Sequence, residues 1–263
     1  MSKTIPADVM SVLKQCKYEG NRLFLPPTNL ERTLYTNTNK IIESRGGKWN
    51  RGAKAHIFPE CVDAAAAMDQ VVATGKFTDT KKELQQFDTP GPLAAKLVDL
   101  ANIIEGDTFL EPSAGNGAII TAILAEAAKA KVWAIEIDQL RCNRIQSIGI
   151  GDGHVIQGDF LHFEPGGING WPEQFDRIIM NPPFAKNQDI DHVLHAFKFL
   201  KPGGRIVAIT SPHFTFATEK KVVAFKKFLE QHNAFWEDVK EGTFKESGTN
   251  VRTVIVTIDK PLL

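Results

Sequence analysis

Short apolar runs of strand length alternate with helical segments through the last two-thirds of the chain, from residue 87 onward. The strand-like runs are Thr108–Leu110, Val132–Ile137, His154–Gln157, Arg177–Met180, Arg205–Thr210 and Val251–Ile258. Helical segments such as Ala118–Ala130 and Ile190–Leu200 lie between most of them, and Thr89-Pro90 starts a further helix ahead of the first run. This alternation predicts an α/β fold with a mainly parallel sheet and helices on both faces. Such sheets bind ligands beyond the carboxyl ends of their strands, where the strand order reverses.

The first 75 residues have a mixed pattern, and the polar segment 76–86 that follows them is expected to be a linker. Thr28 or Asn29 is expected to cap a helix that ends at Gly46-Gly47 and carries an apolar stripe of Leu30, Leu34, Ile41 and Ile42. A hairpin is expected over Lys48–Phe58, and a second helix from Pro59 to Gly75. The pattern therefore predicts a small α+β module at 1–75 and a larger domain at 87–263.

Composition is that of an ordinary globular protein, with 43% apolar and 24% charged residues among 263. No apolar run is long enough to span a bilayer, and the N-terminus has no export signal. The three cysteines are far apart and form no metal-type pair, which predicts a cytoplasmic protein with free thiols and no metal. Net charge is zero, but residues 1–60 carry ten basic and five acidic side chains, a net +5. This uneven charge favours a polyanionic partner.

Acidic and glycine residues stand directly after the first three predicted strands. Glu111-Pro112-Ser113-Ala114-Gly115-Asn116-Gly117 follows the first. Its glycines allow close approach of a ligand, and its carboxylate suits a cation better than a pyrophosphate. Glu136 and Ile137 end the second strand, where an acid can accept both hydroxyls of a ribose. Asp159 and Phe160 follow the third, and they offer an acceptor for an adenine amine and a ring to cover it.

The fourth predicted strand ends in Asn181-Pro182-Pro183-Phe184. Two consecutive prolines restrict the backbone, so that its carbonyls cannot join the sheet and point into the cleft. The Asn181 side-chain oxygen and the Pro182 carbonyl can then both accept from one planar NH2 group. Phe184 supplies a flat face on which a base can stack.

These motifs together resemble those of N6-adenine DNA methyltransferases. The resemblance rests on Phe87-Asp88-Thr89-Pro90, the Glu111–Gly117 loop, Glu136, Asp159-Phe160 and Asn181-Pro182-Pro183-Phe184, and it covers residues 87–263. Their order is that of the gamma class, and Ser247-Gly248-Thr249 before the last strand is also similar. The N-terminal module resembles one found ahead of small phage- or plasmid-borne methyltransferases, the type that belongs to restriction–modification systems. The implied fold is a Rossmann-like class I methyltransferase with a seven-stranded sheet.

The resemblance implies S-adenosylmethionine as cofactor and a role for each motif. Phe87, Thr89 and Pro90 would hold its methionine end together with Glu111, Pro112, Ser113, Gly115 and Gly117. Glu136 would bind the ribose, Ile137 would pack near the cofactor adenine, and Asp159 and Phe160 would bind that ring. Asn181 and Pro182 would bind the target amine beside Pro183, with Asn181 also counted among the cofactor-binding residues, and Phe184 would stack on the flipped base.

The chemistry expected from these residues needs no covalent intermediate. Two acceptors on the N6 hydrogens localise the lone pair of a poor nucleophile, which then attacks the sulfonium methyl in line. Cytosine-C5 chemistry is excluded because none of Cys16, Cys61 and Cys142 follows a proline. Asn-Pro-Pro-Phe also occurs in ribosomal RNA enzymes acting on guanine N2 or adenine N6 and in protein glutamine methyltransferases. An inactive DNA-binding partner subunit is the remaining alternative.

Double-stranded DNA is the expected partner, although gamma-class enzymes carry a long C-terminal recognition domain that this chain does not show after its last strand. The basic residues Arg45, Lys48, Arg51 and Lys54 recur at three-residue spacing in the N-terminal module, with Trp49 and His56 among them. They are the candidate DNA contacts, and the Pro212–Phe228 region is the second candidate for recognition. The sequence leaves open the DNA site, the oligomeric state and any cognate nuclease.

Overall fold

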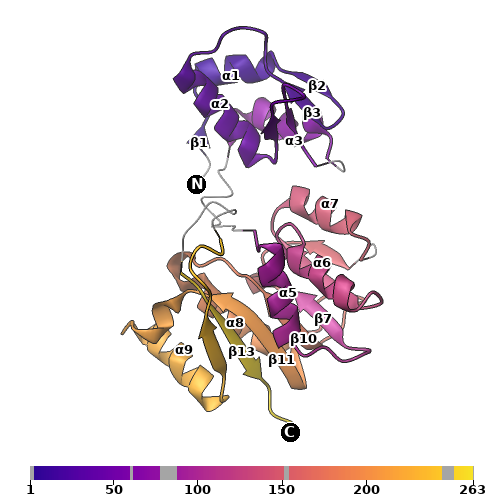
Figure 1. The fold of residues 1–263 in the computed structure, drawn as a ribbon, viewed down its shortest axis with the longest axis vertical. Coiled ribbons are helices and arrows are strands. Elements are labelled where there is room, and N and C mark those ends of the chain that lie inside the picture. The colour runs from indigo at the N-terminus through magenta and orange to yellow at the C-terminus, as the bar shows by residue number, and fades with distance from the viewer. Residues whose placement is uncertain (1–2, 60–61, 78–87, 151–153, 245–251, 263) are drawn as a thin grey trace. The chain divides into compact units, whose positions relative to one another are not determined.

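The chain divides into two compact units, residues 1–86 and residues 87–263 (Figure 1). The computed structural model describes residues 3–59, 62–77, 88–150, 154–244 and 252–262. Among these residues, no helix has the length and apolar character needed to cross a membrane.

The first unit is a small α+β module, as the sequence predicts. A four-stranded antiparallel sheet has the order β2 (Lys17–Glu19), β3 (Arg22–Phe24), β5 (Ala55–Ile57), β4 (Lys48–Asn50). Its helices are α1 (Ala7–Lys14), α2 (Arg32–Ser44) and α3 (Ala64–Thr74), and a two-stranded ribbon joins β1 (Lys3–Thr4) to β6 (Lys76–Phe77). The hairpin expected over Lys48–Phe58 is confirmed as β4 and β5.

The predicted helix starts in this unit are wrong, and one expected linker end is a strand. Helix α2 begins after Glu31, which caps it without a side-chain hydrogen bond, so neither Thr28 nor Asn29 is the cap. Helix α3 begins at Ala64 and not at Pro59, because the Asp63 carboxylate accepts from the Ala66 amide at 2.9 Å. Residues 76–77 pair with the N-terminal strand instead of belonging to a linker.

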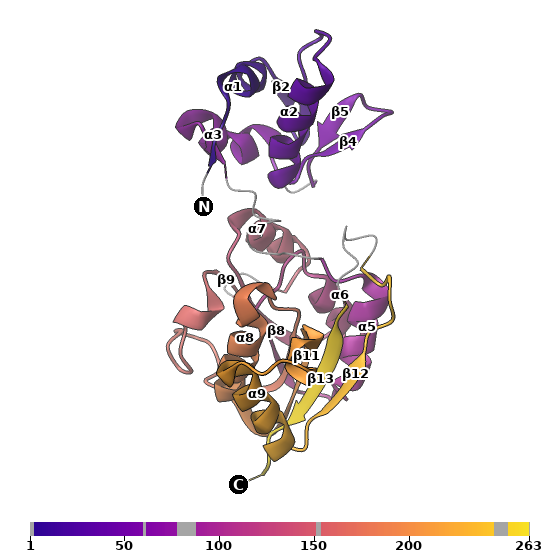
Figure 2. The same ribbon diagram turned by 90° about the vertical axis from the view of Figure 1, so that its left-hand side faces the viewer.

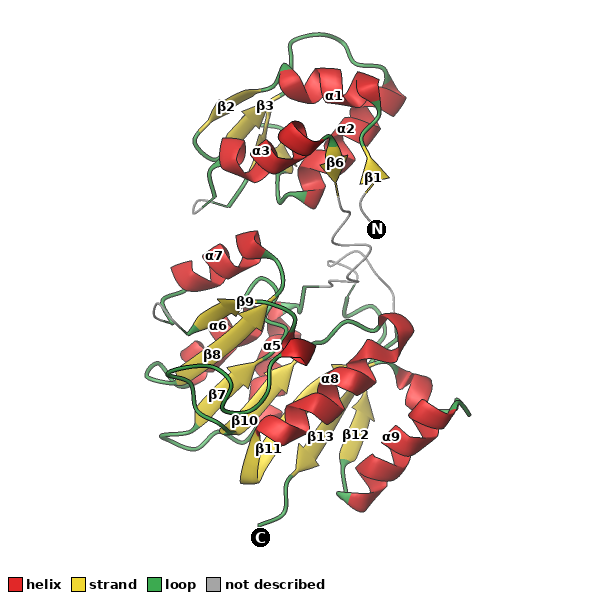
Figure 3. Cartoon of the chain, turned by 180° about the vertical axis from the view of Figure 1, so that it is seen from behind, coloured by secondary structure: helices red, strands yellow, loops and turns green. Residues whose placement is uncertain are grey.

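The second unit is built on a seven-stranded sheet of mainly parallel strands, which confirms the predicted fold class (Figures 1 and 3). The strand order is β12 (Phe235–Asp238), β13 (Val254–Asp259), β11 (Leu200–Thr210), β10 (Phe175–Met180), β7 (Thr108–Glu111), β8 (Lys131–Glu136), β9 (Val155–Gln157). Only β13 runs antiparallel to its neighbours. The chain thus proceeds outward from β7 to β9 and then returns to place β10 on the other side of β7.

Helices cover both faces of this sheet (Figures 2 and 3). One face packs against α5 (Gly91–Leu100), α6 (Ala118–Glu126) and α7 (Gln139–Ser147). The other packs against α8 (Gln188–Ala196) and α9 (Lys220–Gln231). Successive residues of a strand serve opposite faces, as the pleat requires: Val207 belongs to the first core cluster and Ala208 to the second.

The predicted strands are found at their expected places, but the sequence pattern missed β12, α7 and α9. Strand β12 has only four residues at the sheet edge, all at least partly exposed, so it lacks an apolar run. Helix α7 is rich in polar residues and buries only Cys142 and Ile145. The start of the expected strand Val251–Ile258 and the expected Ser247-Gly248-Thr249 segment lie outside the described residues.

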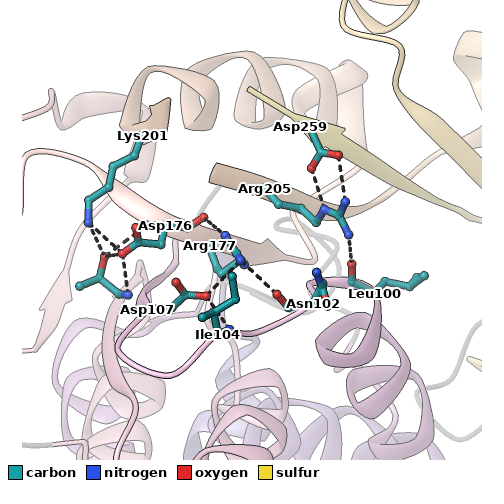
Figure 4. A network of polar contacts seen from close by, with 10 residues as sticks. Leu100, Asn102, Ile104, Asp107, Asp176, Arg177, Lys201, Arg205 and Asp259 are labelled. Carbon is teal, nitrogen blue, oxygen red and sulfur yellow. Dashed lines mark hydrogen bonds and ion pairs between the residues drawn. The ribbon is translucent and has the colours of Figure 1, made fainter. Parts of the chain in front are cut away.

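A network of ion pairs ties the strands together at the amino-terminal edge of the sheet (Figure 4). Asp176 accepts from Lys201 at 2.8 Å and from the hydroxyl of Thr108 at 2.7 Å. Arg177 and Arg205 extend the network to the loop after α5 and to the last strand through their contacts with Asp107, Asn102, Leu100 and Asp259. This edge is structural, which leaves the opposite edge for ligands.

Candidate functional site

The loops after β7 and β10 lie side by side at the point where the strand order reverses. Ile178 pairs with Leu110, and the two parallel strands end within two residues of this pair, at Met180 and Glu111. A crevice at such a switch point is the usual ligand site of a doubly wound sheet. The parallel register therefore brings the Glu111–Gly117 loop and the Asn181–Phe184 motif to one place.

The glycine loop after β7 adopts a conformation that larger residues would disturb. Gly115 and Gly117 have left-handed backbones, with φ of +55° and +78°. A Cβ on Gly117 would lie 2.3 Å from Cδ1 of Ile148, and a Cβ on Gly115 would lie 3.2 Å from the Arg141 guanidinium. The Gly115 amide donates to the Glu136 carboxylate at 2.7 Å, so the loop is held against the end of β8.

Two carboxylates, Glu111 and Glu136, are buried together at this edge. Burial and then the nearby Glu136 charge raise the pKa of Glu111 well above its usual value. Burial also raises the pKa of Glu136, against the opposing effects of the Asp138 amide, Arg141 and the Gly115 amide. One oxygen of Glu111 is buried and has no hydrogen-bond partner among the described residues. A cationic ligand would restore the ionised form of both groups, so the pair fits an ammonium or sulfonium.

Residues just before α5 connect this loop to the Asn181 motif. The Asn116 amide donates to Asp88 at 2.7 Å, and Arg141 lies 3.3 Å from the same carboxylate. The amide nitrogen of Asn181 donates to the Thr89 hydroxyl at 3.0 Å. Thr89 thus fixes which way the Asn181 amide is turned. Pro90 is the N-cap residue of α5, and Phe87 lies outside the described residues.

The proline-rich motif itself is half-buried. Pro182 is buried, Pro183 is partly exposed, and Phe184 packs against the first core cluster. Phe244, which the sequence analysis did not single out, is buried in that same cluster. The motif therefore has a rigid apolar base, and an aromatic ring borders the switch point.

The remaining expected cofactor residues lie after β8 and β9 and differ in exposure. Ile137 is an exposed apolar side chain next to Glu136. Asp159 is partly exposed and accepts from the Leu161 amide at 3.0 Å, with His162 at 3.7 Å. Phe160 is only 1% exposed. Its ring packs against His192, His195 and Phe199, so the structure uses Phe160 as a core residue rather than as an exposed ring face.

A contact that the sequence analysis missed joins the glycine loop to α8. The Ser113 hydroxyl lies 3.2 Å from Nδ1 of His192. Burial lowers the pKa of His192 to about 4, so the imidazole is neutral at physiological pH. The sequence pattern of α8 does not predict the Ser113–His192 contact, because this contact depends on which strand lies beside β10. Pro112, between Glu111 and Ser113, is buried.

The basic residues of the N-terminal module separate into two groups. Lys48, Arg51 and Lys54 are exposed on the β4–β5 hairpin. Arg45 is partly buried, and its Nε donates to the Ala67 carbonyl at 3.1 Å. Arg45 is thus engaged in a packing contact within the module.

The doubly wound sheet, the glycine loop with two buried acids and the Asn-Pro-Pro-Phe motif at the switch point define a class I methyltransferase dependent on S-adenosylmethionine. Residues 97–238 match the methyltransferase small domain family, to which the chain belongs. Glu111, with its unpartnered oxygen, and Glu136 fit the cationic and ribose ends of this cofactor. In the described part of the chain, no three His, Cys, Asp or Glu side chains gather as a metal site.

Comparisons with individual proteins give three relatives with different names: a type II methyltransferase, a protein assigned as an RNA methyltransferase and a restriction-enzyme modification subunit. The type II methyltransferase M.AccI of Acinetobacter calcoaceticus is 29% identical over 118 residues, which are 43% of this chain and 20% of that protein. A structure from Pyrococcus horikoshii, assigned as an RNA methyltransferase, is 25% identical with a TM-score of 0.51 and covers 68% of this chain and 88% of its own. The modification subunit of an assigned type I restriction enzyme from Vibrio vulnificus is 16% identical with a TM-score of 0.57 and covers 88% and 54%. The chain thus spans only part of the restriction–modification relatives.

Proposed function

We propose that the chain transfers a methyl group from S-adenosylmethionine to the N6 amine of adenine in DNA. The observation that carries the proposal is the orientation of Asn181. Its amide nitrogen donates to the Thr89 hydroxyl, which orients the amide so that the Asn181 oxygen can serve as an acceptor for a substrate amine. With the Pro182 carbonyl it offers two acceptors for one NH2 group, beside the phenyl ring of Phe184.

In this mechanism the residues of the chain orient and activate the amine. S-adenosylmethionine, when bound, supplies the methyl group that the amine attacks in line. Asn181 and Pro182 accept hydrogen bonds from the two N6 hydrogens and stabilise the positive charge that develops on nitrogen. As the N–CH3 bond forms, the S–CH3 bond of the cofactor would break to leave a neutral thioether, and the methylated nitrogen then loses one proton to solvent. Phe184 stacks on the base, which must leave the duplex to reach the site. Glu111 and Glu136 hold the cofactor, and the first core cluster, which contains Phe244, keeps the Asn181–Phe184 motif rigid.

DNA is supported as the substrate by two observations. The relative from Acinetobacter calcoaceticus is a type II methyltransferase, and the fold neighbour from Vibrio vulnificus is the modification subunit of an assigned type I restriction enzyme. The N-terminal module presents Lys48, Arg51 and Lys54 on one exposed hairpin, which suits the phosphates of a duplex. We assign the N-terminal unit, residues 1–86, to DNA binding and residues 87–263 to methyl transfer.

A second candidate is methylation of RNA, at guanine N2 or adenine N6. The likeness to the Pyrococcus horikoshii protein assigned as an RNA methyltransferase favours it. Both substrates present a planar amine on a ring, so the Asn181 motif accepts either. The substrate has to be identified by where the methyl group goes.

The test is transfer of radiolabelled methyl groups to duplex DNA, to ribosomal RNA and to total protein, followed by hydrolysis and identification of the labelled product. We expect N6-methyladenine from DNA. Asn181→Ala should lower the rate by about 100- to 1000-fold, as other losses of a charge-stabilising group do. Cofactor affinity, measured by calorimetry, should stay unchanged because Asn181 acts on the acceptor.

The matched control is Asn143→Ala, which removes an exposed asparagine of α7 that accepts from Gln139. It should leave the rate unchanged. Label in ribosomal RNA but not in DNA would show that the second candidate is correct. Label on a glutamine side chain, or cofactor binding without any transfer, would contradict both.

A further inference from the structure

An exposed phenylalanine, Phe216, stands on the segment that follows β11. Its side chain is 71% exposed, which makes it one of the most exposed large apolar side chains among the described residues. The segment is well ordered by hydrogen bonds: Ser211 caps the short helix η4 (Pro212–Thr215), and the Phe216 amide donates to the His213 carbonyl. The Phe216 ring meets the His213 ring edge to face, with centroids 5.4 Å apart. A structured turn therefore presents this aromatic ring to the outside.

This turn is attached to the helix that follows the Asn181–Phe184 motif. The Ser211 amide donates to Asp189 at 2.8 Å. Lys221, at the start of α9, donates to Asp191 at 2.6 Å. Both acids lie in the first turn of α8, only a few residues after Phe184.

The register of the sheet gives the same placement. Ala208 of β11 pairs with Met180 of β10, so Thr210, two residues further along β11, lies beside the start of the Asn181–Phe184 motif. The chain then continues directly into the Phe216 turn. Phe216 therefore stands at the carboxyl edge of the sheet, next to the motif that would receive a target base.

The surroundings of Phe216 suit a nucleic-acid strand. Lys186, which directly follows the motif, and Lys220, at the start of α9, are exposed, and neither has an ion-pair partner among the described residues. Three acids lie nearby: Asp189 accepts from the Ser211 amide, Asp191 is paired with Lys221, and Glu219 lies 3.2 Å from Nε2 of His213. An aromatic face flanked by cations is the usual arrangement for stacking on a base while the backbone phosphates are held.

We propose that Phe216 inserts into the base stack beside the target nucleotide and occupies the place that the flipped adenine leaves. This inference rests on the proposed function, because only an enzyme that extrudes a base from a duplex creates such a gap. Extrusion costs the stacking and pairing of the target base, and a ring that fills the gap restores part of it. The His213 ring behind Phe216 limits the positions that the wedge can take.

The experiment compares Phe216→Ala with Phe235→Ala, both in the full-length chain. Phe235 is also highly exposed, at 62%. It is the first residue of β12, where it pairs with Thr257, and it therefore lies at the amino-terminal edge of the sheet and not at the carboxyl edge. On fully paired duplex, Phe216→Ala should lower kcat/KM by about tenfold, equivalent to ~1.4 kcal/mol. Phe235→Ala should lower it little, and Phe216→Tyr should keep most of the activity because the ring remains.

The second substrate is the same duplex with the target adenine opposite an abasic site. Such an adenine is already unpaired and costs less to extrude, so most of the Phe216→Ala loss should disappear. Cofactor affinity should not change in any of the three variants. A thermal unfolding scan verifies that all of them are folded.

The outcomes separate this inference from the proposed function. If the native chain methylates DNA and Phe216→Ala matches Phe235→Ala on both duplexes, Phe216 is not a wedge and the inference is wrong. The same holds if Phe216→Ala leaves methylation intact but abolishes self-association in sedimentation, since the ring is then a protein contact. If the native chain methylates no DNA, the proposed function fails and the inference fails with it.

Discussion

Replacing Glu111 by glutamine should make the cofactor-free protein more stable at neutral pH while weakening its hold on S-adenosylmethionine. Glu111 is only 2% exposed, and one of its oxygens has no partner among the described residues. Its charged form is disfavoured by burial and by the neighbouring Glu136. Glutamine keeps the shape of the side chain and removes the charge, so the desolvation cost of Glu111 and its repulsion by Glu136 are both removed.

The sign of the pH dependence follows from the raised pKa. At a pH between the usual glutamate pKa of 4.5 and the raised pKa of the folded state, Glu111 is ionised in the unfolded chain but protonated in the folded one. The free energy of unfolding should therefore be highest below pH 4.5 and fall as pH rises toward the folded pKa. One extra bound proton gives a slope of at most about 1.4 kcal/mol per pH unit. For a domain of this size, each 1 kcal/mol shifts Tm by roughly 2–4 °C.

The assay is urea and thermal unfolding of cofactor-free protein between pH 4.5 and 8, with cofactor affinity measured by calorimetry. Glu111→Gln should flatten the pH dependence and lower the affinity by about 10- to 150-fold, the equivalent of losing one charge-assisted hydrogen bond. The control, Glu126→Gln, alters an exposed glutamate at the end of α6 and should change neither quantity. A Glu111→Gln variant with native affinity and a native pH profile would refute the assignment of this carboxylate to the cofactor.

Three further changes test other parts of the structure. Thr89→Val removes the hydroxyl that accepts from Asn181 and should slow single-turnover methyl transfer by about tenfold, in line with a lost buried hydrogen bond. The control variant, Thr89→Ser, should retain the native rate. Equal rates for Thr89→Val and the native chain would contradict this role of Thr89. Burial raises the pKa of Asp176, but the hydrogen bonds from Lys201 and Thr108 outweigh this effect and hold the pKa below 3.8. Asp176→Asn should therefore lower the free energy of unfolding at pH 7, measured in urea, by about 1 kcal/mol. It should also remove the loss of stability that the native chain shows as pH falls below 3.8. The last change replaces the three exposed hairpin cations together by alanine, namely Lys48, Arg51 and Lys54. Duplex binding should weaken and the slope of log affinity against log salt should fall by about 0.9 per lost phosphate contact, without any effect on cofactor affinity; an unchanged slope would show that the module does not bind phosphates.

Local patterns predicted the second unit well because its elements are regular and its ligand motifs are continuous in sequence. The glycines of the Glu111–Gly117 loop permit, and the prolines after Asn181 restrict, the same backbone conformations in any context. The first unit was harder, because strands of three residues such as Arg22–Phe24 are too short for a period to show. The start of its helix α3 depended on a single side chain, Asp63, and not on the more conspicuous Pro59.

The sequence by itself determined the alternation of strands and helices, and with it the type of sheet and the motifs at the strand ends, since each depends on neighbouring residues only. The tertiary structure alone decided that β10 lies beside β7, and hence that Asn181 meets Thr89 across 92 positions of chain. It also decided that Ser113 meets His192 and that Phe160 is buried. These contacts depend on strand order and on the packing of α8, and the free energy that selects them is summed over two core clusters rather than encoded in any local segment.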